Sequence, residues 1–356
     1  MKLNLNYHIY LSFNNKSVHN AKAAAVLMWV LLCSMSAFGQ RSTLSKPYDV
    51  VVYGASPAGI TAAIAAAREN RSVILLEPAA YIGGIMSDGL SGTDIDNHGG
   101  FTNHEAVGGL ALEFYKRVAS RYGWLDSLND AIAKDLKKPA FWRYEPHMAT
   151  LVFENWLKEH QITVLRNFKL VRSRTGHGVI VENGRIQSIR DAADRLIKGK
   201  VFIDATLEGD LLAEAGVSMI TGRESGSLYG EEMNGVRPLD AGSKLKIQID
   251  PFIVEGDSTS GLIPGITKIS SLHPGEADHR LQAYCFRVCL TKDPSNKLEI
   301  PRPANYSREQ YEIYLRYMEK GGKFYVPDTN IPNGKIDFNG GGALSHNIYG
   351  GHDSYP

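Results

Sequence analysis

The stretch VVVYGASPAG, residues 50–59, places two glycines and a serine where a strand would turn into a helix. Gly54 and Gly59 match the outer glycines of the dinucleotide-binding pattern G-x-G-x-x-G, and Ser56 stands at the middle glycine. Glu77 follows 23 positions after Gly54. Backbone N–H groups at such a turn bind phosphate oxygens, and a carboxylate at this spacing accepts hydrogen bonds from ribose hydroxyls. These residues predict a nucleotide site that disfavours the 2′-phosphate of NADP.

Serine at position 56 is compatible with this site. The middle glycine lets the backbone approach a pyrophosphate closely, and serine is the next smallest polar choice. The Ser56 hydroxyl can donate to a phosphate oxygen or cap the following helix. Proline is tolerated at the first helical position, Pro57, because the N–H that it lacks would have no partner within the helix. The competing interpretation is an ordinary strand–turn–helix crossover without a ligand; the position of Glu77 favours the nucleotide site.

The elements that would position these residues form a βαβ unit. An apolar, β-branched strand is predicted over residues 48–53, an alanine-rich helix over 57–69 and a second apolar strand over 72–77. Two strands joined by one helix in this way pair in parallel with a right-handed crossover. The expected fold class is therefore α/β, with a Rossmann-like domain built on a central parallel sheet.

The chain after the first 45 residues divides into two predicted domains. The first covers 46–217 and carries a helical insertion over about 103–160. Within it the patterns predict helices around 105–122 and 146–160, a strand in ITVLRNFKLVRS, a hairpin turning at Asn183-Gly184, a buried strand over 198–206 and a short helix after it. Polar stretches, prolines and scattered strands over 218–356 indicate a β-rich α+β substrate domain.

Residues 1–39 are typical of a secretory signal peptide. Lys16 and Lys22 precede the apolar run Ala23–Cys33, which is shorter than the roughly 20 residues that a membrane span needs. Ala37 and Gly39 are the small residues before a cleavage at Gln40. We therefore expect a periplasmic or secreted protein with no stable membrane span after signal removal.

Charge and cysteine content exclude several function classes. The 39 Lys and Arg residues nearly balance 38 Asp and Glu, so no bulk field favours nucleic acid and no such partner is expected. Cys285 and Cys289 remain after signal removal and would lie about 13 Å apart on one face of a strand, too far for a disulfide. We interpret them as small buried residues. Two cysteines cannot hold a four-iron cluster, and no metal site is predicted.

Several segments together carry a family resemblance. They are VVVYGASPAG, LLEPAAYIGGIMSDGLSGTDI, VGGLALEFYKRV, WRYEPHMA, VFIDATLEGDLLAEAGV, GRES…YGEEMNG, AYCFRVCLT and PNGKIDFN. From about Tyr48 to its end, the chain resembles a bacterial family of FAD-dependent oxidoreductases. The nucleotide half of that family resembles the glutathione-reductase type of FAD fold and is distantly similar to one component of heterodisulfide reductase.

The resemblance implies a set of FAD-binding positions. The first turn would bind the pyrophosphate, and Glu77 would bind the adenosine ribose. Gly83 and Gly84 would lie beside the phosphates and the flavin, and backbone near Leu170 would contact the adenine. The segment DATLEGD would form a second turn beside the cofactor. The implied residues are Gly54, Ser56, Pro57, Ala58, Gly59, Glu77, Gly83, Gly84, Met86, Gly89, Leu170, Ala205, Thr206, Gly209 and Asp210.

The chain also departs from the family pattern. Relatives similar to the heterodisulfide reductase component carry iron–sulfur cysteines that this chain lacks, so no cluster is expected. Family members usually continue further, with a late segment that brings a helix N-terminus to the flavin, and the ending GGHDSYP predicts a truncated or split chain. No second glycine-rich turn for NAD(P)H is evident, so the reducing equivalents would come from the substrate or a partner.

The expected function is that of an exported FAD-dependent oxidoreductase. A small organic substrate would give a hydride to FAD, and an unidentified acceptor would then take the electrons. The candidate catalytic residues are His98, Glu145, His147 and Arg287, each of which also has an ordinary structural interpretation. The alternatives are a truncated, non-catalytic nucleotide-binding fragment and an accessory protein of extracellular glycan use.

Overall fold

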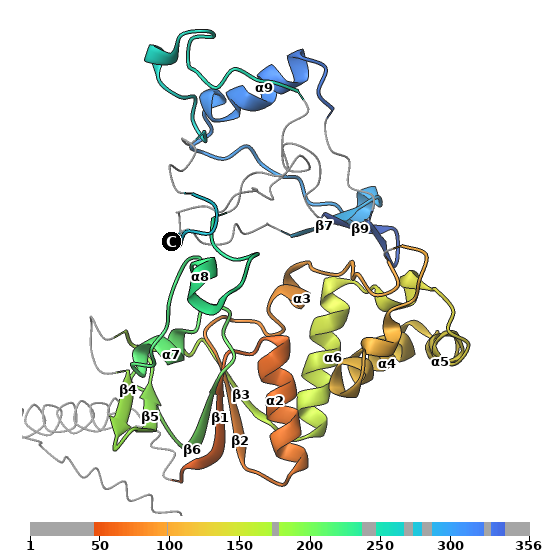
Figure 1. Ribbon diagram of the computed structural model, residues 1–356. Coiled ribbons are helices and arrows are strands. Elements are labelled where there is room, and N and C mark those ends of the chain that lie inside the picture. Colours follow the sequence, from red (N-terminus) through yellow and green to blue (C-terminus); the bar gives the residue numbers. More distant parts are fainter. Residues whose placement is uncertain are drawn as a thin grey trace, which may run out of the picture.

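A computed structural model describes residues 46–97, 99–172, 178–236, 247–266, 273–279, 287–323 and 329–338 (Figure 1). Its centre is a six-stranded sheet in the order β3-β2-β1-β6-β5-β4. The parallel strands are β1 (Tyr48–Tyr53), β2 (Val73–Glu77), β3 (Thr163–Arg166) and β6 (Leu196–Asp204). The predicted α/β class and central parallel sheet are confirmed.

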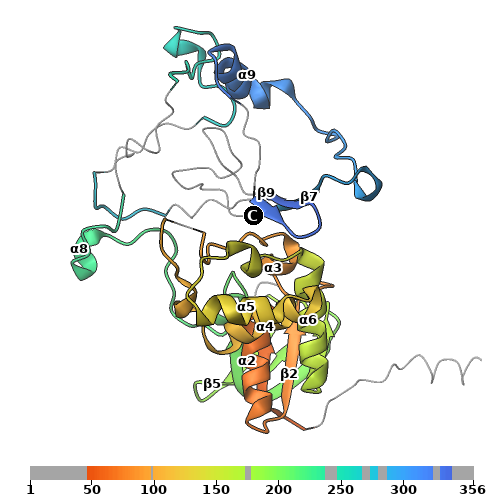
Figure 2. The ribbon, with the colours of Figure 1, turned by 90° about the vertical axis from the view of Figure 1, so that its right-hand side faces the viewer.

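One face of this sheet is covered by helices of the N-terminal part. These are α2 (Pro57–Arg68), α4 (Gly109–Tyr122) and α6 (Pro146–Glu159), as Figures 1 and 2 show. Val52 and Leu75 point to this face and pack with Ile60, Phe153 and Trp156 in one buried cluster. The helices lie close to the strands because α2 presents mainly small side chains, PAGITAAIAAAR.

The opposite face of the sheet buries the alternate strand residues. Val51 and Ile74 pack there with Phe168, Ile189 and Ile197, as the two-residue period of a strand requires. β4 (Val179–Glu182) and β5 (Arg185–Arg190) form the predicted hairpin, and its turn residues Asn183 and Gly184 have φ of 51° and 72°. β5 continues antiparallel onto the start of β6.

Shorter helices complete this part of the chain. They are α3 (Ile85–Asp88), α5 (Leu125–Ala133) and α7 (Asp210–Glu214). The sequence patterns predict α7 but neither α3 nor α5. α3 is a single turn inside a glycine-rich stretch, and α5 begins only two residues after Gly123, which ends α4 in the left-handed conformation at φ 77°.

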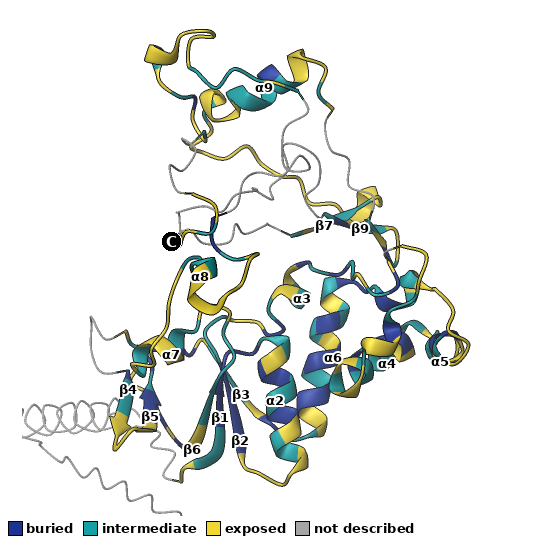
Figure 3. Cartoon of the chain, viewed as in Figure 1, coloured by how far each residue is buried: buried dark blue, intermediate teal, exposed yellow. Residues whose placement is uncertain are grey.

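The described residues after 217 are mostly exposed or partly exposed (Figure 3). They contain α8 (Gly226–Tyr229), α9 (Glu312–Glu319) and a small antiparallel sheet in the order β7-β9-β8, with bounds Val288–Thr291, Lys335–Phe338 and Thr329–Ile331. Both ribbon views place this sheet beside the N-terminal end of α6.

Cys289 corrects one prediction. It lies in β7 but is exposed, so the interpretation as a buried strand residue is wrong for this thiol. The first two residues of β7, Val288 and Cys289, are exposed, and the last two are partly buried. Cys285 lies outside the described residues.

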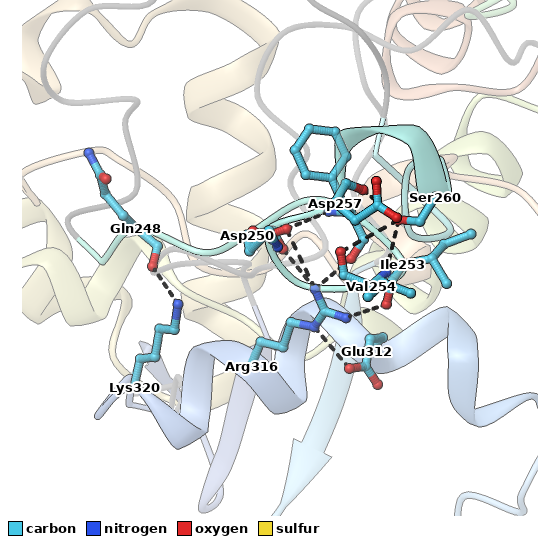
Figure 4. Close-up of polar contacts among 11 residues, drawn as sticks. Gln248, Asp250, Ile253, Val254, Asp257, Ser260, Glu312, Arg316 and Lys320 are labelled. Atoms are coloured by element: carbon cyan, nitrogen blue, oxygen red, sulfur yellow. Dashed lines mark hydrogen bonds and ion pairs between the residues drawn. The ribbon is translucent and has the colours of Figure 1, made fainter.

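A buried arginine organises the chain around α9 (Figure 4). Arg316 is only 7% exposed, and its Nη atoms donate to three backbone carbonyls, of Asp250, Phe252 and Ile253, at 2.7–3.0 Å. Its Nε donates to Glu312 at 2.9 Å. Because guanidinium donors in a fixed fork satisfy several acceptors at once, this one side chain holds the 250–263 loop against α9.

Replacing Arg316 with Met should therefore loosen that loop. Three carbonyls would lose charge-assisted donors, and we expect amide exchange over 252–263 to accelerate at least about tenfold in native-state hydrogen exchange. Arg308→Met, at an exposed position, is the matched control. Equal exchange rates in the Arg316 variant and the wild-type protein would show that the arginine does not hold the loop.

Candidate functional site

The first turn of the site is a backbone crossing with no room for a side chain. Gly54 ends β1 with φ +98°, and a Cβ added there would lie 2.7 Å from the carbonyl carbon of Ala205 and from the Thr206 nitrogen. The Ala205 N–H donates to the Tyr53 carbonyl at 2.7 Å, which fixes this approach. The glycine turn and the DATLEGD turn, far apart in sequence, therefore meet at the carboxyl ends of β1 and β6.

Gly59 packs the start of α2 onto the same turn. A Cβ at this position would stand 2.0 Å from the Gly54 carbonyl oxygen. Ser56 is the N-cap of α2: its hydroxyl accepts from the Gly59 N–H at 3.3 Å and donates to the Ala205 carbonyl at 2.7 Å. Of the two predicted roles of Ser56, the cap is the one observed, and its proton is engaged within the protein.

Glu77 ties the second strand to the turn. Its Oε2 accepts from the Ala55 N–H, and its Oε1 accepts from the Ala79 N–H, both at 2.7 Å. Each carboxylate oxygen has further acceptor capacity beyond one hydrogen bond. The carboxylate is half-buried at the end of β2, the position from which a ribose is bound in Rossmann-type sites.

The paired glycines lie against the same turn from the other side. The Gly83 N–H donates to the Ala55 carbonyl at 2.8 Å, and Gly83 has φ +100°. Gly84 has φ +50°, and a Cβ there would lie 3.5 Å from the Ser56 Cα. The structure therefore brings the predicted glycines of both segments together, with α3, Met86 and Gly89 following directly.

The second turn is ordered by its own side chains. Asp204 accepts from the Thr206 N–H at 2.9 Å and from the Leu212 N–H at 2.9 Å, and the Thr206 hydroxyl accepts from the amides of Gly209 and Asp210. Gly209 takes the left-handed conformation, with φ +73°, and α7 begins at Asp210. The turn is thus held in shape before any ligand binds.

Comparison with known proteins agrees with this geometry. A family model described as FAD dependent oxidoreductase matches residues 49–352. This chain belongs to that family. FAD is the cofactor of the family.

Individual relatives are more distant. The 4-oxocyclohexanecarboxylate 2-dehydrogenase of Sinomonas cyclohexanicum is 29% identical over 116 residues, which are 32% of this chain and 20% of that protein. The matched segment therefore spans a fifth of this relative. Among solved structures, L-proline dehydrogenase from P.horikoshii has 16% identity and a TM-score of 0.35 over 51% of this chain and 59% of that one. L-amino acid deaminase from Proteus vulgaris has 16% sequence identity and a TM-score of 0.36, over 52% of this chain and 54% of that one.

The residues of the turn fit an FAD pyrophosphate. The amide N–H groups of Ser56 and Ala58 have no hydrogen-bond partner among the described residues, and they stand at the N-terminus of a helix, where N–H groups and the helix dipole favour an anion. At Gly54 and Gly59 an added Cβ would overlap the backbone of Ala205 and of Gly54, so these glycines let the main-chain segments of the turn meet. Glu77, at the end of β2, would be the acceptor for the ribose hydroxyls, and this role stays a prediction.

Leu170 is placed differently from the other predicted contacts. Its backbone N–H donates to the Tyr53 hydroxyl at 3.2 Å, and its side chain is 7% exposed within the core of the second sheet face. The amide is therefore already engaged, and a role of this backbone at adenine stays a prediction.

An apolar groove runs along the outer side of α2. It has a volume of about 620 Å³. Its walls come from α2, α4 and α6 together with Met86, and are formed by Pro57, Ala58, Thr61, Ala62, Ala65, Met86, Leu110, Ala111, Phe114, Tyr115 and Phe153. Burial raises the pKa of Tyr115 to about 12, so its hydroxyl stays protonated at neutral pH.

No hydrogen bond or ion pair joins the three catalytic candidates that the structure describes, Glu145, His147 and Arg287. His98 lies outside the described residues, and His147 is exposed in the first turn of α6. Glu145 is 1% exposed and is bound by Lys335, by Asn333 at 2.7 Å and by the Tyr122 hydroxyl at 3.0 Å. Because its carboxylate is enclosed in this network, Glu145 anchors the small sheet to α6.

Arg287 is the candidate whose Nε and Nη2 have no hydrogen-bond partner among the residues that the structure describes. Its Nη1 contacts Asp337 at 3.2–3.3 Å. Asp337, which is fully buried, also accepts from the amides of Ser91 and Gly92 at 3.2 and 2.7 Å. Sequence reasoning missed Asp337, because its segment KIDF reads as an ordinary strand.

Sequence reasoning also missed a second buried carboxylate, Asp96, which pairs with a buried histidine. Asp96 is 1% exposed and lies 2.9 Å from His104 Nδ1, and it accepts from the Trp142 indole at 3.1 Å. Asp96 has φ +56°, and its own N–H donates to Asn103. No sequence spacing marks this pair, because the histidine approaches from a separate single-turn helix. Among the described residues, no group of three or more metal-ligating side chains was found.

The network around Glu145 predicts a pH dependence of stability. Burial acts to raise the pKa of Glu145, but hydrogen bonds from Lys335, Asn333 and Tyr122 outweigh it and lower the pKa below its usual 4.5. A carboxylate with a lowered folded-state pKa stabilises the protein above its unfolded pKa, and that contribution is lost as the pH falls through the lowered value.

The free energy of unfolding should therefore fall more steeply below about pH 4.5 in the wild-type protein than in Glu145→Gln. Urea denaturation at a series of pH values measures both slopes. Glu182→Gln, on the exposed hairpin, serves as the control. Parallel pH profiles for wild type and Glu145→Gln would contradict this role.

Proposed function

We propose that this chain binds FAD at the joined turns and that the protein oxidises a small organic substrate. The convergence of Gly54, Gly59, Gly84 and the Ala205-Thr206 turn at one backbone crossing carries the proposal. When bound, FAD accepts a hydride from a carbon next to a heteroatom and later releases the electrons. A separate acceptor then takes those electrons.

Each protein segment has a separate task in this proposal. The free amides at the start of α2 bind the pyrophosphate, and Glu77 holds the ribose. Gly83 and Gly84 let the main chain pass close to the cofactor. The 89–97 segment borders the substrate side because it follows α3 directly, and the small sheet lies there as well because Asp337 on β9 accepts from the amides of Ser91 and Gly92.

The proposed location is the periplasm or the exterior of the cell. The signal-like run within residues 1–39 supports this location. Those residues lie outside the described part, and within the described residues no helix is long and apolar enough to cross a membrane.

The substrate class can be approached by a direct screen. The curated relative is named for 4-oxocyclohexanecarboxylate, which makes that acid a first compound to test. Bleaching of the flavin absorbance under anaerobic conditions reports hydride transfer without knowledge of the acceptor.

Glu77→Ala should weaken FAD binding by about 10- to 100-fold, because hydrogen bonds to a charged group contribute about 1.5–3 kcal/mol. Fluorescence titration of the apoprotein with FAD measures the Kd, and Glu182→Ala is the matched control at another strand end. Since Glu77 also binds the amides of Ala55 and Ala79, urea denaturation without FAD must be recorded for the same variant. A loss of stability together with an unchanged Kd for FAD would remove Glu77 from the ribose role.

A further inference from the structure

Arg287 stands close to the proposed cofactor site through an unbroken chain of contacts. Gly84 lies against Ser56: a Cβ added to Gly84 would lie 3.5 Å from the Cα of Ser56. The single-turn helix α3 follows, and Gly89 ends it with φ +141°. A Cβ at Gly89 would lie 3.1 Å from the backbone and Cβ of Arg287. α3 has four residues, and a helix rises about 1.5 Å per residue. The segment that separates Gly84, at the proposed cofactor site, from Gly89, at Arg287, is therefore a helix roughly 6 Å long.

The guanidinium is oriented by one of its edges only. The Asp337 carboxylate accepts hydrogen bonds from Nη1 of Arg287 at 3.2–3.3 Å. It also accepts hydrogen bonds from the backbone amides of Ser91 and Gly92. Asp337 has no exposed surface, so it cannot serve as a ligand group for a substrate. Its role is to position the arginine.

The remaining edge of Arg287 is open. Nε and Nη2 have no hydrogen-bond partner among the described residues, and neither belongs to the buried unpaired polar atoms of those residues. The side chain is 19% exposed. Nε and Nη2 carry two parallel N–H bonds, and this is the edge of arginine that binds a carboxylate in a bidentate manner.

We propose that Arg287 binds the carboxylate of an organic acid substrate. This inference rests on the proposed function, which places a small organic substrate at this site. It narrows the class of that substrate to compounds that carry a carboxylate. Lysine could supply the charge but not the paired donors, so the arginine fork selects a planar anion. Asp337 leaves this fork available because it engages Nη1 alone.

The test is a calorimetric titration of the mature protein with benzoate and acetate, each paired with its neutral amide, benzamide and acetamide. The acids should bind and the amides should not. Arg287→Met should weaken binding of the acids by about 10- to 100-fold, as expected for hydrogen bonds to a charged group. Arg302→Met removes an exposed arginine that stacks on Tyr306 and should leave binding unchanged.

Arg287→Lys covers the case in which the methionine variant fails to fold, which circular dichroism would reveal. It keeps the charge but not the fork, and we expect several-fold weaker binding of both acids. Absence of acid binding to the wild-type protein, or equal binding in Arg287→Lys and wild type, would overturn the proposal.

The same titration is run with and without FAD, while FAD content is measured separately by absorbance. Acid binding to a chain that takes up no FAD would support the arginine site while contradicting the proposed oxidoreductase function. FAD uptake with no acid binding would support the proposed FAD site while contradicting the role of Arg287 in binding a carboxylate.

Discussion

The close backbone crossing at Gly54 is the constraint on which the rest of the site depends. The carboxyl ends of β1 and β6 approach so closely there that even a methyl group would overlap the Ala205 carbonyl carbon at 2.7 Å. This approach lets the Ser56 hydroxyl bridge the start of α2 and the second turn. It also sets the position of Gly84 against Ser56. Three separate segments of the chain therefore meet through main-chain contact, with few side chains involved, at the surface that we propose binds the FAD pyrophosphate.

Two buried carboxylates hold the small sheet against this core. Asp337 joins β9 to the segment after α3, and Glu145 joins the N-terminal end of α6 to Lys335 on β9. Removing one partner of a buried ion pair leaves an uncompensated charge, which costs several kcal/mol. The placement of the small sheet beside the cofactor cradle, and with it the position of Arg287, is thus fixed by charge as well as by packing.

Local patterns in the sequence were sufficient to predict the βαβ unit and its turn. The apolar strands, the alanine-rich helix and the Asn183-Gly184 hairpin each depend on residues a few positions apart, and all are present. The catalytic candidates show where such reasoning ends. Glu145 reads as a reactive carboxylate, but its partners Asn333 and Lys335 lie about 190 residues further along the chain. No periodicity or motif reports a contact of that sequence separation, and the same holds for Asp337 and Ser91.

The central claim is that the three glycine-containing segments form one FAD site, and hydrogen–deuterium exchange with and without FAD tests it most directly. The account predicts that FAD slows exchange in peptides covering 54–59, 77–89 and 205–210 together, while peptides from α9 and the 250–263 loop remain unchanged. Protection of only one of the three segments, or no protection at saturating FAD, would contradict the account.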